Sequence, residues 1–279
     1  MDQALVTRRE LMERLRTAAR DITLPLFDSA MGEDGMVVED KGPSEGAFFH
    51  FDPVTNADKD AEERLRALIT AAFPDDAIEG EEFPDHSGTS GWLWTLDPID
   101  GTRAFVAGVP VWSTLIAVSR EGVPVLGLID LPALDQAFWG EVTEDSKRAW
   151  RVDSKGTTDL STRPCASLTP AILGCTAPFG MFSEGERAAY MMVRSGVSFS
   201  RLGLDALGYA LVASGRMDII IESRLKPCDV RALIPVVEGA GGRLTDWRGG
   251  SAVDGGRVVA VGDAGLLPEL YTYLGRAME

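Results

Sequence analysis

Two acids near the middle of the chain have the type and spacing to bind a divalent cation. They lie in Trp94–Phe105, where a short apolar run is followed by Asp97, Pro98, Ile99, Asp100, Gly101 and Thr102. This pattern predicts a strand that stops at Asp97, a turn, and a helix that begins at Gly101. Two carboxylates and the carbonyl of Ile99 can then converge on one point. Mg²⁺ prefers such oxygen ligands and is usually held by a few carboxylates together with a phosphate.

The start of that helix could also bind an anion. The amides of Gly101 and Thr102 would face the same point, and the unpaired N–H groups and positive dipole end of a helix favour a phosphate. The alternative is that these residues only form a turn, with Asp97 ending the strand and Asp100 capping the helix. The hexapeptide by itself does not decide between the two interpretations.

Three further acidic segments occur where secondary structure elements are expected to begin or end. Asp58 stands at the start of a helical pattern that runs to Ala72, where an acid caps the helix and complements its dipole. Glu81 stands at the end of a brief expected strand. Its neighbour Glu82 is also an acid, and two adjacent carboxylates repel each other unless solvent or a cation offsets their charge. If that strand lies beside the one ending at Asp97, Glu81 reaches the same point. Asp229 follows a proline-bearing turn at another helix start. Capping alone is the better local interpretation of Asp58.

Apolar periodicity predicts the elements that position these acids. Helices are expected at residues 4–27, 58–72, 184–193, 206–214 and 230–238, and strands at 77–82, 111–118, 123–130, 136–142, 171–175, 198–202 and 217–222. The strands between residues 111 and 142 should form an antiparallel meander, whereas strands and helices alternate beyond residue 170. The polar stretch 143–162 separates the two patterns. We therefore expect two domains, residues 1–150 and residues 151–279.

Four other features are given structural roles. Met31–Phe51, rich in Gly and acids, is interpreted as a flap or hairpin with a short strand at Met36–Val38. The glycines of Gly239–Gly242 follow a helix, so they are expected to end it and form a turn rather than a nucleotide loop. Trp94 and Trp112 alternate with apolar neighbours, which indicates core positions.

The composition argues against several classes of protein. The chain of 279 residues has 27 Lys and Arg against 43 Asp and Glu, a formal net charge of −16. Such a surface repels nucleic acid and anionic membranes, so neither is an expected partner. Three separated cysteines without a CxxC pair indicate a reducing compartment, and no apolar run has membrane-spanning length, so we expect a cytoplasmic protein. With only His50 and His86 available, a His-dependent triad or zinc site is not expected.

Taken together, the acidic segments resemble those of the inositol monophosphatase family of metal-dependent phosphomonoesterases. The segments are Asp52–Asp58, Gly80–Glu82, Asp97–Thr102 and Cys228–Asp229, and the resemblance extends from about Leu5 to Gly250. It implies an α+β / α/β fold, a layered αβαβα sandwich of the inositol monophosphatase and fructose-1,6-bisphosphatase type. It also implies two or three Mg²⁺ ions, a small phosphorylated metabolite as substrate, and a homodimer. Cys228 departs from the family, which commonly has an aromatic residue at that position.

The resemblance also implies roles for individual residues. The metal ligands would be Glu81, Asp97, the carbonyl of Ile99, Asp100 and Asp229. Asp58 and Thr102 would orient and activate the attacking water, with Glu81 beside them in the catalytic set. Gly101 and Thr102 would bind the phosphate.

Two segments look more like the histidinol-phosphatase branch than the inositol branch of the family. They are Arg103 with Gly108–Trp112, and Leu225–Gly242. L-Histidinol phosphate is therefore the first expected substrate. Arg103 could contact the substrate phosphate or pair with an acid on the first helical turn, and these two roles are weighed equally.

Two acids are expected to contact the leaving group of the substrate. Glu222 lies seven residues before Asp229, a spacing shared by the family's substrate-contacting acid, and Asp205 opens the preceding helix. A cationic amino alcohol suits two acids, whereas inositol would use them as hydroxyl acceptors. For Asp205, a helix cap is an equally weighted alternative.

Three other functions stay open. An inositol monophosphatase is the second enzymatic interpretation. A phosphatase for 3′-phosphoadenosine nucleotides is the third, and the absence of an obvious basic or aromatic base pocket disfavours it. A non-catalytic regulator on the same fold belongs to a different class, against which the complete set of acids argues.

Overall fold

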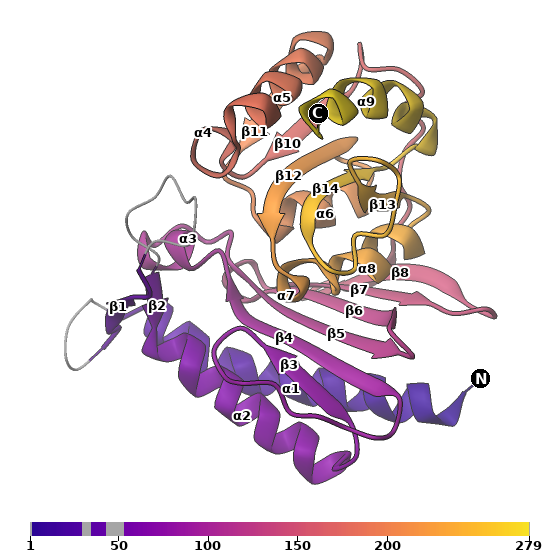
Figure 1. The fold of residues 1–279 in the computed structure, drawn as a ribbon. Helices are drawn as coiled ribbons and strands as arrows, with labels where there is room; N and C mark the ends of the chain where they lie inside the picture. Colours follow the sequence, from indigo (N-terminus) through magenta and orange to yellow (C-terminus); the bar gives the residue numbers. More distant parts are fainter. Residues whose placement is uncertain (1, 30–34, 43–52, 279) are drawn as a thin grey trace.

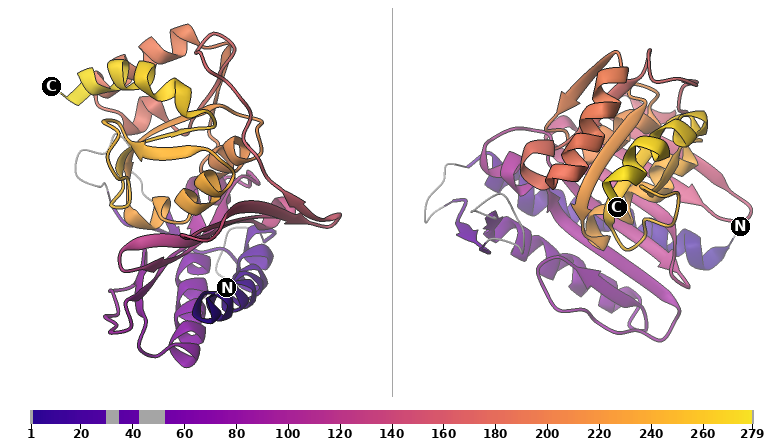
Figure 2. Two further views of the ribbon diagram at one scale, coloured as in Figure 1. Left: turned by 90° about the vertical axis from the view of Figure 1, so that its right-hand side faces the viewer. Right: turned by 45° about the horizontal axis from the view of Figure 1, so that its top comes forward.

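The computed structural model describes residues 2–29, 35–42 and 53–278, which form two large β-sheets separated and flanked by helices, and a small two-stranded sheet (Figure 1). Helices α1 and α2 cover one face of a seven-stranded sheet, and α6 and α8 cover its other face. A five-stranded sheet follows, with α5 and α9 packed on its outer face through the buried side chains Tyr190, Val193 and Leu270. The views in Figure 2 show the same succession of layers. The expected αβαβα sandwich is confirmed.

The first layer consists of the two helices that the apolar periodicity predicts. They are α1 (Gln3–Phe27) and α2 (Asn56–Ala72). Leu11, Leu15 and Ile69 are buried between these helices and the sheet. A small antiparallel pair, β1 (Val38–Asp40) with β2 (Pro53–Thr55), precedes α2. The short strand therefore begins two residues later than the expected Met36–Val38, and the flap assigned to Met31–Phe51 lies outside the described residues apart from 35–42.

The seven-stranded sheet has the order β3-β4-β5-β6-β7-β8-β9. Its strands are β3 (Ala77–Gly80), β4 (Trp92–Asp100), β5 (Ser113–Arg120), β6 (Val123–Leu131), β7 (Gln136–Val142), β8 (Lys147–Asp153) and β9 (Gly156–Asp159). β3 runs parallel to β4, as the position of Glu81 required, and the other neighbours are antiparallel. β8 and β9 occupy most of the stretch interpreted as a polar boundary. They carry little apolar alternation, because the side chains of β9 are exposed and most of those of β8 are only half-buried.

The five-stranded sheet has the order β11-β10-β12-β14-β13. Its strands are β10 (Ile172–Cys175), β11 (Phe199–Leu202), β12 (Ile219–Leu225), β13 (Arg243–Asp246) and β14 (Gly256–Val261). β10 is parallel to β11 and β12, whereas β14 is antiparallel to both of its neighbours. The sequence had indicated β10, β11 and β12 but not β13 and β14. Along the chain, the last strand of the seven-stranded sheet ends at Asp159 and the first strand of the five-stranded sheet begins at Ile172. The division into domains at residue 150 stays a prediction.

Shorter helices complete the layers. They are α3 (Thr102–Val106), α4 (Pro178–Met181), α5 (Glu184–Gly196), α6 (Ala206–Ala213), α7 (Pro227–Val230), α8 (Leu233–Gly239) and α9 (Leu267–Leu274), with 3₁₀ turns η1 (Pro132–Leu134), η2 (Ala264–Leu266) and η3 (Gly275–Met278). The single helix expected at residues 230–238 is two helices, because Pro235 has no N–H to donate to the carbonyl of Arg231. The turn expected at Gly239–Gly242 is confirmed by Gly241, whose φ is +101°.

Two glycines in the seven-stranded sheet let α8 approach closely. A Cβ on Gly127 would lie 2.1 Å from the carbonyl oxygen of Ala232, and one on Gly140 would lie 2.1 Å from that of Pro235. Any larger residue would push the α7–α8 segment away from the strands. Since α7, which carries Asp229, directly precedes α8, this close approach also keeps Asp229 near the seven-stranded sheet that carries Asp97.

The remaining structural expectations concern tryptophans and the membrane. Trp94 and Trp112 are both fully buried, so their core positions are confirmed. Among the described residues, no helix is both long and apolar enough to cross a bilayer.

Candidate active site

A bulge at the end of β4 brings Asp97 and Asp100 to the same side of the sheet. Asp97 pairs with Leu115 and Asp100 with Ser113, so β4 has one residue more than β5 between these pairs. Residues three apart on a regular strand face opposite sides, and the extra residue of a bulge reverses that. Both acids therefore line one pocket. The strand continues to Asp100, and the expectation that it stops at Asp97 was wrong. Pro98 lacks a ladder donor, but a bulge tolerates proline.

The buried carboxylate of Asp97 faces other negative charges. Asp97 is 2% exposed, and its Oδ1 accepts a hydrogen bond from the amide of Ile99 at 3.1 Å. Burial raises the pKa of Asp97 well above its ordinary value, and the nearby charge of Glu81 raises it further. A buried carboxyl in this setting needs either a proton or a cation to be stable.

Asp100 connects the seven-stranded sheet to α6. Its Oδ2 accepts hydrogen bonds from the hydroxyl of Ser113 and from the amide of Ala206, both at 3.0 Å. Burial again raises the pKa of Asp100 well above its ordinary value, followed by repulsion from Asp205. Asp100 therefore caps α6 rather than α3, which was not an interpretation that local sequence suggested.

The turn after Asp100 has the conformation that glycine favours. Gly101 has φ of +82° and precedes α3, and Thr102 donates from Oγ1 to the carbonyl of Ile99 at 3.1 Å. A Cβ on Gly101 would lie 3.0 Å from Oδ2 of Asp205. The turn thus places the carbonyl of Ile99, the hydroxyl of Thr102 and the carboxylate of Asp205 around one space.

Glu81 is held by two lysines. Its Oε1 accepts from Nζ of Lys226 at 2.8 Å and from Nζ of Lys41 at 3.3 Å, and Lys41 also pairs with Glu82. Burial opposes ionisation of Glu81, but the charges of Lys226 and Lys41 outweigh it and lower the pKa of Glu81. The repulsion between the adjacent acids Glu81 and Glu82 is therefore offset by the positive charges of Lys41 and Lys226. Neither lysine was identified from the sequence, although Lys226 stands only three residues before Asp229.

Three acids and a thiol converge where α7 meets β4. Single ligand atoms of Glu81, Asp97, Cys228 and Asp229 all lie within 4.8 Å of one another. Asp229 accepts from the amide of Lys226 at 2.7 Å, and burial, then the charge of Glu81, raise the pKa of Asp229 to about 6. Such a concentration of carboxylates, of which Asp97 is buried and Glu81 and Asp229 are half-buried, fits a divalent cation. Asp100 lies outside this group and faces α6 instead.

Asp58 belongs to a capping box at the start of α2. Thr55 is the N-cap residue, and Oδ2 of Asp58 accepts from its amide at 2.8 Å and from its hydroxyl at 2.6 Å. Asp58 is thus the third residue of the helix, and its side chain caps the helix start through the amide of Thr55, as the local interpretation expected. Burial raises the pKa of Asp58 to about 6, against the hydrogen bonds from Thr55. Between the two described residues Asp58 and Thr102 there is no hydrogen bond.

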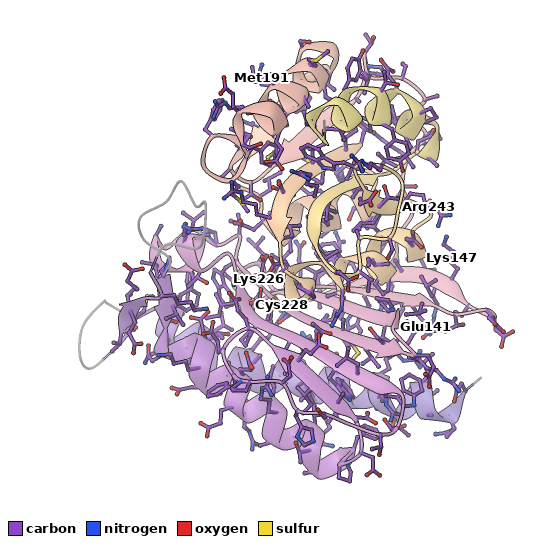
Figure 3. The ribbon with its side chains drawn as sticks, in the orientation of Figure 1. Glu141, Lys147, Met191, Lys226, Cys228 and Arg243 are labelled. Atoms are coloured by element: carbon purple, nitrogen blue, oxygen red, sulfur yellow. The ribbon has the colours of Figure 1, made fainter. Side chains whose placement is uncertain are left out.

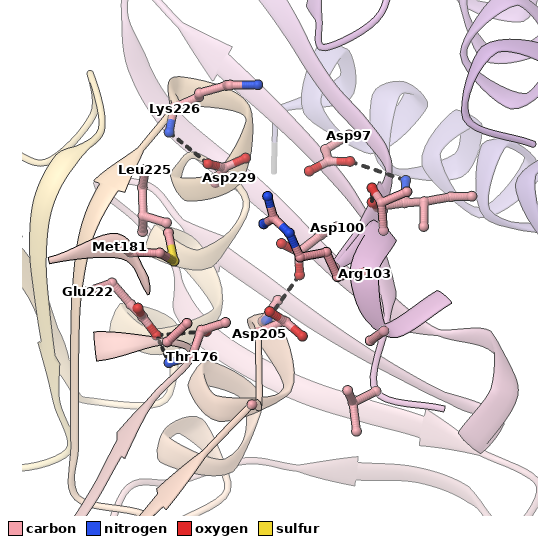
Figure 4. Close-up of a pocket in the computed structure, with 18 of the residues that line it drawn as sticks. Asp97, Asp100, Arg103, Thr176, Met181, Asp205, Glu222, Leu225, Lys226 and Asp229 are labelled. Atoms are coloured by element: carbon pink, nitrogen blue, oxygen red, sulfur yellow. Dashed lines mark hydrogen bonds between the residues drawn. The ribbon is translucent and has the colours of Figure 1, made fainter. Parts of the chain in front are cut away.

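The pocket beside these acids has a volume of about 700 Å³, which suits a small ligand. Figure 4 shows acids from both halves of the chain around it: Asp97 and Asp100 from β4, Asp229 from α7, Asp205 from the start of α6 and Glu222 from β12. Arg103 also lines this pocket, and its positive charge partly offsets the burial that raises the pKa of Asp205. The sequence did not reveal that Met181 and Thr176 line the same space.

Asp205 and Glu222 are both in the pocket, as their expected role requires. Asp205 occupies the N-cap position of α6 with φ of +46° but makes no side-chain capping bond, so the alternative of a simple cap was wrong. Burial raises the pKa of Asp205 to about 6. Glu222 accepts from the amide and hydroxyl of Thr176 at 2.7 and 2.9 Å, and burial raises its pKa to about 8.

Comparison with known proteins gives a consistent assignment. A model described as the inositol monophosphatase family matches residues 8–277. The chain is 45% identical over 199 residues to the bifunctional phosphatase IMPL2, chloroplastic, of Arabidopsis thaliana, covering 71% of this chain and 55% of that protein. It is 38% identical over 208 residues to a histidinol-phosphatase of Mycobacterium tuberculosis, covering 75% of this chain and 79% of that one.

A solved structure agrees in fold. An inositol monophosphatase from Zymomonas mobilis aligns with a TM-score of 0.79 and 31% identity, covering 98% of this chain and all of that chain. Fold and relatives define a phosphoric monoester hydrolase. The chain belongs to the inositol monophosphatase family. It spans just over half the length of the Arabidopsis relative.

Proposed function

We propose that this protein hydrolyses a small phosphate monoester with Mg²⁺, and that L-histidinol phosphate is its preferred substrate. The observation that carries the proposal is the convergence of Glu81, Asp97 and Asp229 beside a pocket that also holds Asp205 and Glu222. The name of the Mycobacterium relative, a histidinol-phosphatase, supports the substrate.

The metal would be held by residues from three elements. Glu81 follows β3, Asp97 ends the regular part of β4 and Asp229 lies on α7, and we infer that the carbonyl of Ile99 and the carboxylate of Asp100 complete a site for two or three ions. When bound, Mg²⁺ offsets the charge of the phosphate and activates water as a nucleophile. The buried acids need that charge, because burial and mutual repulsion disfavour their ionised forms.

Other residues of the chain would place the water and the phosphate. The hydroxyl of Thr102 and the carboxylate of Asp58 are the groups inferred to orient the attacking water, with Glu81 beside them. Thr102 now donates to Ile99 and Asp58 accepts from Thr55, so each would exchange one partner or share it with the water. The amides of Gly101 and Thr102 are inferred to contact the phosphate, and Arg103 adds positive charge at the same pocket.

Asp205 and Glu222 would recognise the leaving group. The high pKa of Glu222, about 8, means that its carboxyl is largely protonated near neutral pH in the empty pocket. An ammonium group placed beside it favours the carboxylate, so a cationic amino alcohol would convert a buried neutral acid into one partner of an ion pair. A neutral polyol would gain hydrogen bonds but no charge pairing, which is why histidinol phosphate is preferred over inositol phosphate.

The second candidate is inositol monophosphatase activity. The Zymomonas structure favours it, since it aligns with nearly the whole chain. The protonated carboxyl of Glu222 and the carboxylate of Asp205 could accept hydrogen bonds from inositol hydroxyls without any change of charge.

The test is phosphate release from histidinol phosphate, inositol 1-phosphate and 3′-phosphoadenosine 5′-phosphate, with Mg²⁺ and with a chelator. We expect Mg²⁺-dependent turnover with histidinol phosphate preferred, and Glu222→Gln should reduce that preference over inositol 1-phosphate. Preference for inositol 1-phosphate or the nucleotide would replace the substrate assignment. A folded protein that releases no phosphate from any of them would indicate a non-catalytic regulator.

We also propose a cytoplasmic homodimer. Phe199 and Leu202 on β11, an edge strand of the five-stranded sheet, are 50% and 47% exposed. Met191 and Met192 on α5 are 41% and 40% exposed, and Figure 3 shows Met191 directed outward from that helix. Exposed apolar side chains of this kind mark interfaces. Light scattering after size exclusion should give the mass of a dimer, and Phe199→Asp should shift it toward that of a monomer.

A further inference from the structure

Cys228 places a sulfur atom among the carboxylates of the proposed metal site. Its side chain is buried, being 8% exposed, and its Sγ lies 3.5 Å from Oδ1 of Asp229. One ligand atom each from Glu81, Asp97, Cys228 and Asp229 falls within a span of 4.8 Å. Figure 3 shows Cys228 and Lys226 at the junction of α7 with the end of β4. The donor set is therefore one thiol and three carboxylates, rather than oxygen alone.

The spacing of these four atoms suits tetrahedral coordination. Zn²⁺ binds sulfur at about 2.3 Å and carboxylate oxygen at about 2.0–2.2 Å, so neighbouring ligand atoms of a tetrahedral site lie about 3.3–3.8 Å apart. The separation of Cys228 Sγ and Asp229 Oδ1, 3.5 Å, already falls in that range. The largest separation, at most 4.8 Å, requires side-chain movements of about 1 Å.

The ligand atoms, one sulfur and three carboxylate oxygens, determine which metal ions bind this site tightly. Mg²⁺ is a hard cation that seeks six oxygen ligands and gains nothing from sulfur, whereas Zn²⁺ and Cd²⁺ bind thiolates strongly. We propose that Cys228, Glu81, Asp97 and Asp229 form a high-affinity site for a thiophilic divalent ion such as Zn²⁺ or Cd²⁺, which competes with Mg²⁺ for the same three carboxylates. The inference rests on the proposed function, because it concerns the same metal site.

Binding of such an ion has a definite proton balance. The thiol of Cys228 gives its proton to solvent as the sulfur–metal bond forms. The ammonium of Lys226 leaves Oε1 of Glu81, where it now lies at 2.8 Å, and turns toward solvent. Lys226 is 53% exposed at its side chain, so it can remain hydrated there. The site thus exchanges the thiol proton, the proton of the buried Asp97 carboxyl and the contacts of Lys226 and Lys41 with Glu81 for a doubly charged ion.

Cd²⁺ is the probe that tests the proposal, because a cadmium–thiolate bond has its own ultraviolet charge-transfer absorption. Titration of the metal-free, full-length protein should produce this band with one equivalent of Cd²⁺. Loss of a group outside the ligand set commonly costs about 10–100-fold in metal affinity, so loss of the sulfur ligand in Cys228→Ser should weaken Cd²⁺ binding at least about tenfold and abolish the band. Cys165→Ser and Cys175→Ser are the matched controls, since both remove a buried free thiol and both should retain the band.

A second measurement does not depend on how the variant folds. X-ray absorption at the zinc edge of the wild-type protein with one equivalent of Zn²⁺ should show one sulfur neighbour at about 2.3 Å and oxygen neighbours otherwise. A shell of oxygen alone, or a cadmium band that survives in Cys228→Ser, would overturn the proposal.

These readouts are separate from turnover. A protein that releases phosphate with Mg²⁺ but gives no cadmium band keeps the proposed function and loses this inference. A protein that gives the Cys228-dependent band but hydrolyses no phosphate ester keeps the inference and loses the proposed function. In the expected case Zn²⁺ raises the Mg²⁺ concentration needed for turnover, and less so in Cys228→Ser than in the wild type.

Discussion

The ammonium of Lys226 lies 2.8 Å from Oε1 of Glu81, so a lysine from the second half of the chain neutralises a proposed metal ligand from the first half. Any divalent ion that binds Glu81 must displace this contact. Exposed ion pairs are worth about 0.2–1 kcal/mol, and Lys226 is more than half exposed. We expect Lys226→Met to strengthen Mg²⁺ binding by up to about fivefold, as measured by isothermal titration calorimetry.

Lys155→Met is the control for that experiment. Lys155 lies in the exposed turn between β8 and β9, and its replacement should leave the Mg²⁺ affinity unchanged. If Lys226→Met weakened Mg²⁺ binding, the lysine would have to support the bound metal rather than compete with it.

Asp100→Asn tests the metal assignment. The asparagine keeps an oxygen that can accept from Ser113 and Ala206, so the link between β5 and α6 should survive. Loss of the negative charge should reduce phosphate release at least about a hundredfold, because even groups outside a ligand set change activity by 10–100-fold. Circular dichroism should be unchanged, and the thermal midpoint without metal should not fall. Asp21→Asn, an exposed change on α1, is the control, and full activity in Asp100→Asn would contradict the assignment.

The capping box of α2 is predicted to serve both stability and activity. Thr55→Ala removes the N-cap hydroxyl, which costs about 1 kcal/mol in free energy of unfolding, and also removes the 2.6 Å hydrogen bond that orients Asp58. Turnover at saturating substrate should therefore fall. Ser183→Ala is a matched control, because Ser183 and Glu186 form the equivalent capping box of α5. It should cost similar stability and leave turnover intact; equal turnover in both variants would remove the proposed role of Asp58.

The buried acid Glu222 predicts how stability depends on pH in the metal-free protein. Burial raises its pKa from 4.5 to about 8, so between these values the folded protein retains a proton that the unfolded chain has lost. The contribution of Glu222 to stability is then complete below about pH 4.5 and is lost as the pH rises through about 8. Thermal midpoints measured with a chelator should fall from pH 5 to pH 8, and less steeply in Glu222→Gln.

Glu186→Gln is the control for the pH experiment. Although burial opposes it, hydrogen bonds from Ser183 and Arg257 lower the pKa of Glu186, so its contribution to stability is present at high pH and is lost on acidification. This variant should not flatten the decline toward pH 8. An unchanged slope in Glu222→Gln would show that other buried acids, such as Asp97 and Asp100, account for the decline.

Arg231 is predicted to fix the separation of the two halves at the metal site. Its guanidinium donates to Glu79 on β3, to the hydroxyl of Thr95 on β4 at 3.2 Å and to the carbonyl of Val253 at 3.2 Å. Hydrogen bonds to charged groups are worth about 1.5–3 kcal/mol, so Arg231→Met should lower the free energy of unfolding by about that amount in a urea titration. Mg²⁺ binding should weaken as well, because Asp229 is two residues away.

Arg243→Met serves as the comparison. Arg243 makes an exposed ion pair with Glu238, whose loss should change stability by less than about 1 kcal/mol. An equal effect of the two substitutions would mean that Arg231 acts only as an ordinary surface charge.

The sequence by itself determined most of the acidic residues and the main elements. Asp97, Asp100 and Asp229 stand next to segments with a clear apolar pattern. Helices α1 and α2 and the meander of β5, β6 and β7 could be predicted because their apolar residues recur with the period of a helix or a strand. Exposed strands such as β9 escaped prediction, because a strand without a buried face has no alternation to detect.

Only the tertiary structure decided which of these acids share a site. The bulge in β4 turns Asp97 and Asp100 to one side, and the glycines of β6 and β7 let α7 bring Asp229 beside Glu81. Three further features join residues that are distant in sequence or depend on the exact backbone geometry. They are the contacts of Glu81 with two lysines, the thiol of Cys228 among the acids, and the capping of α6 by Asp100. Local propensity carries no information about such contacts, because burial and packing between elements create them.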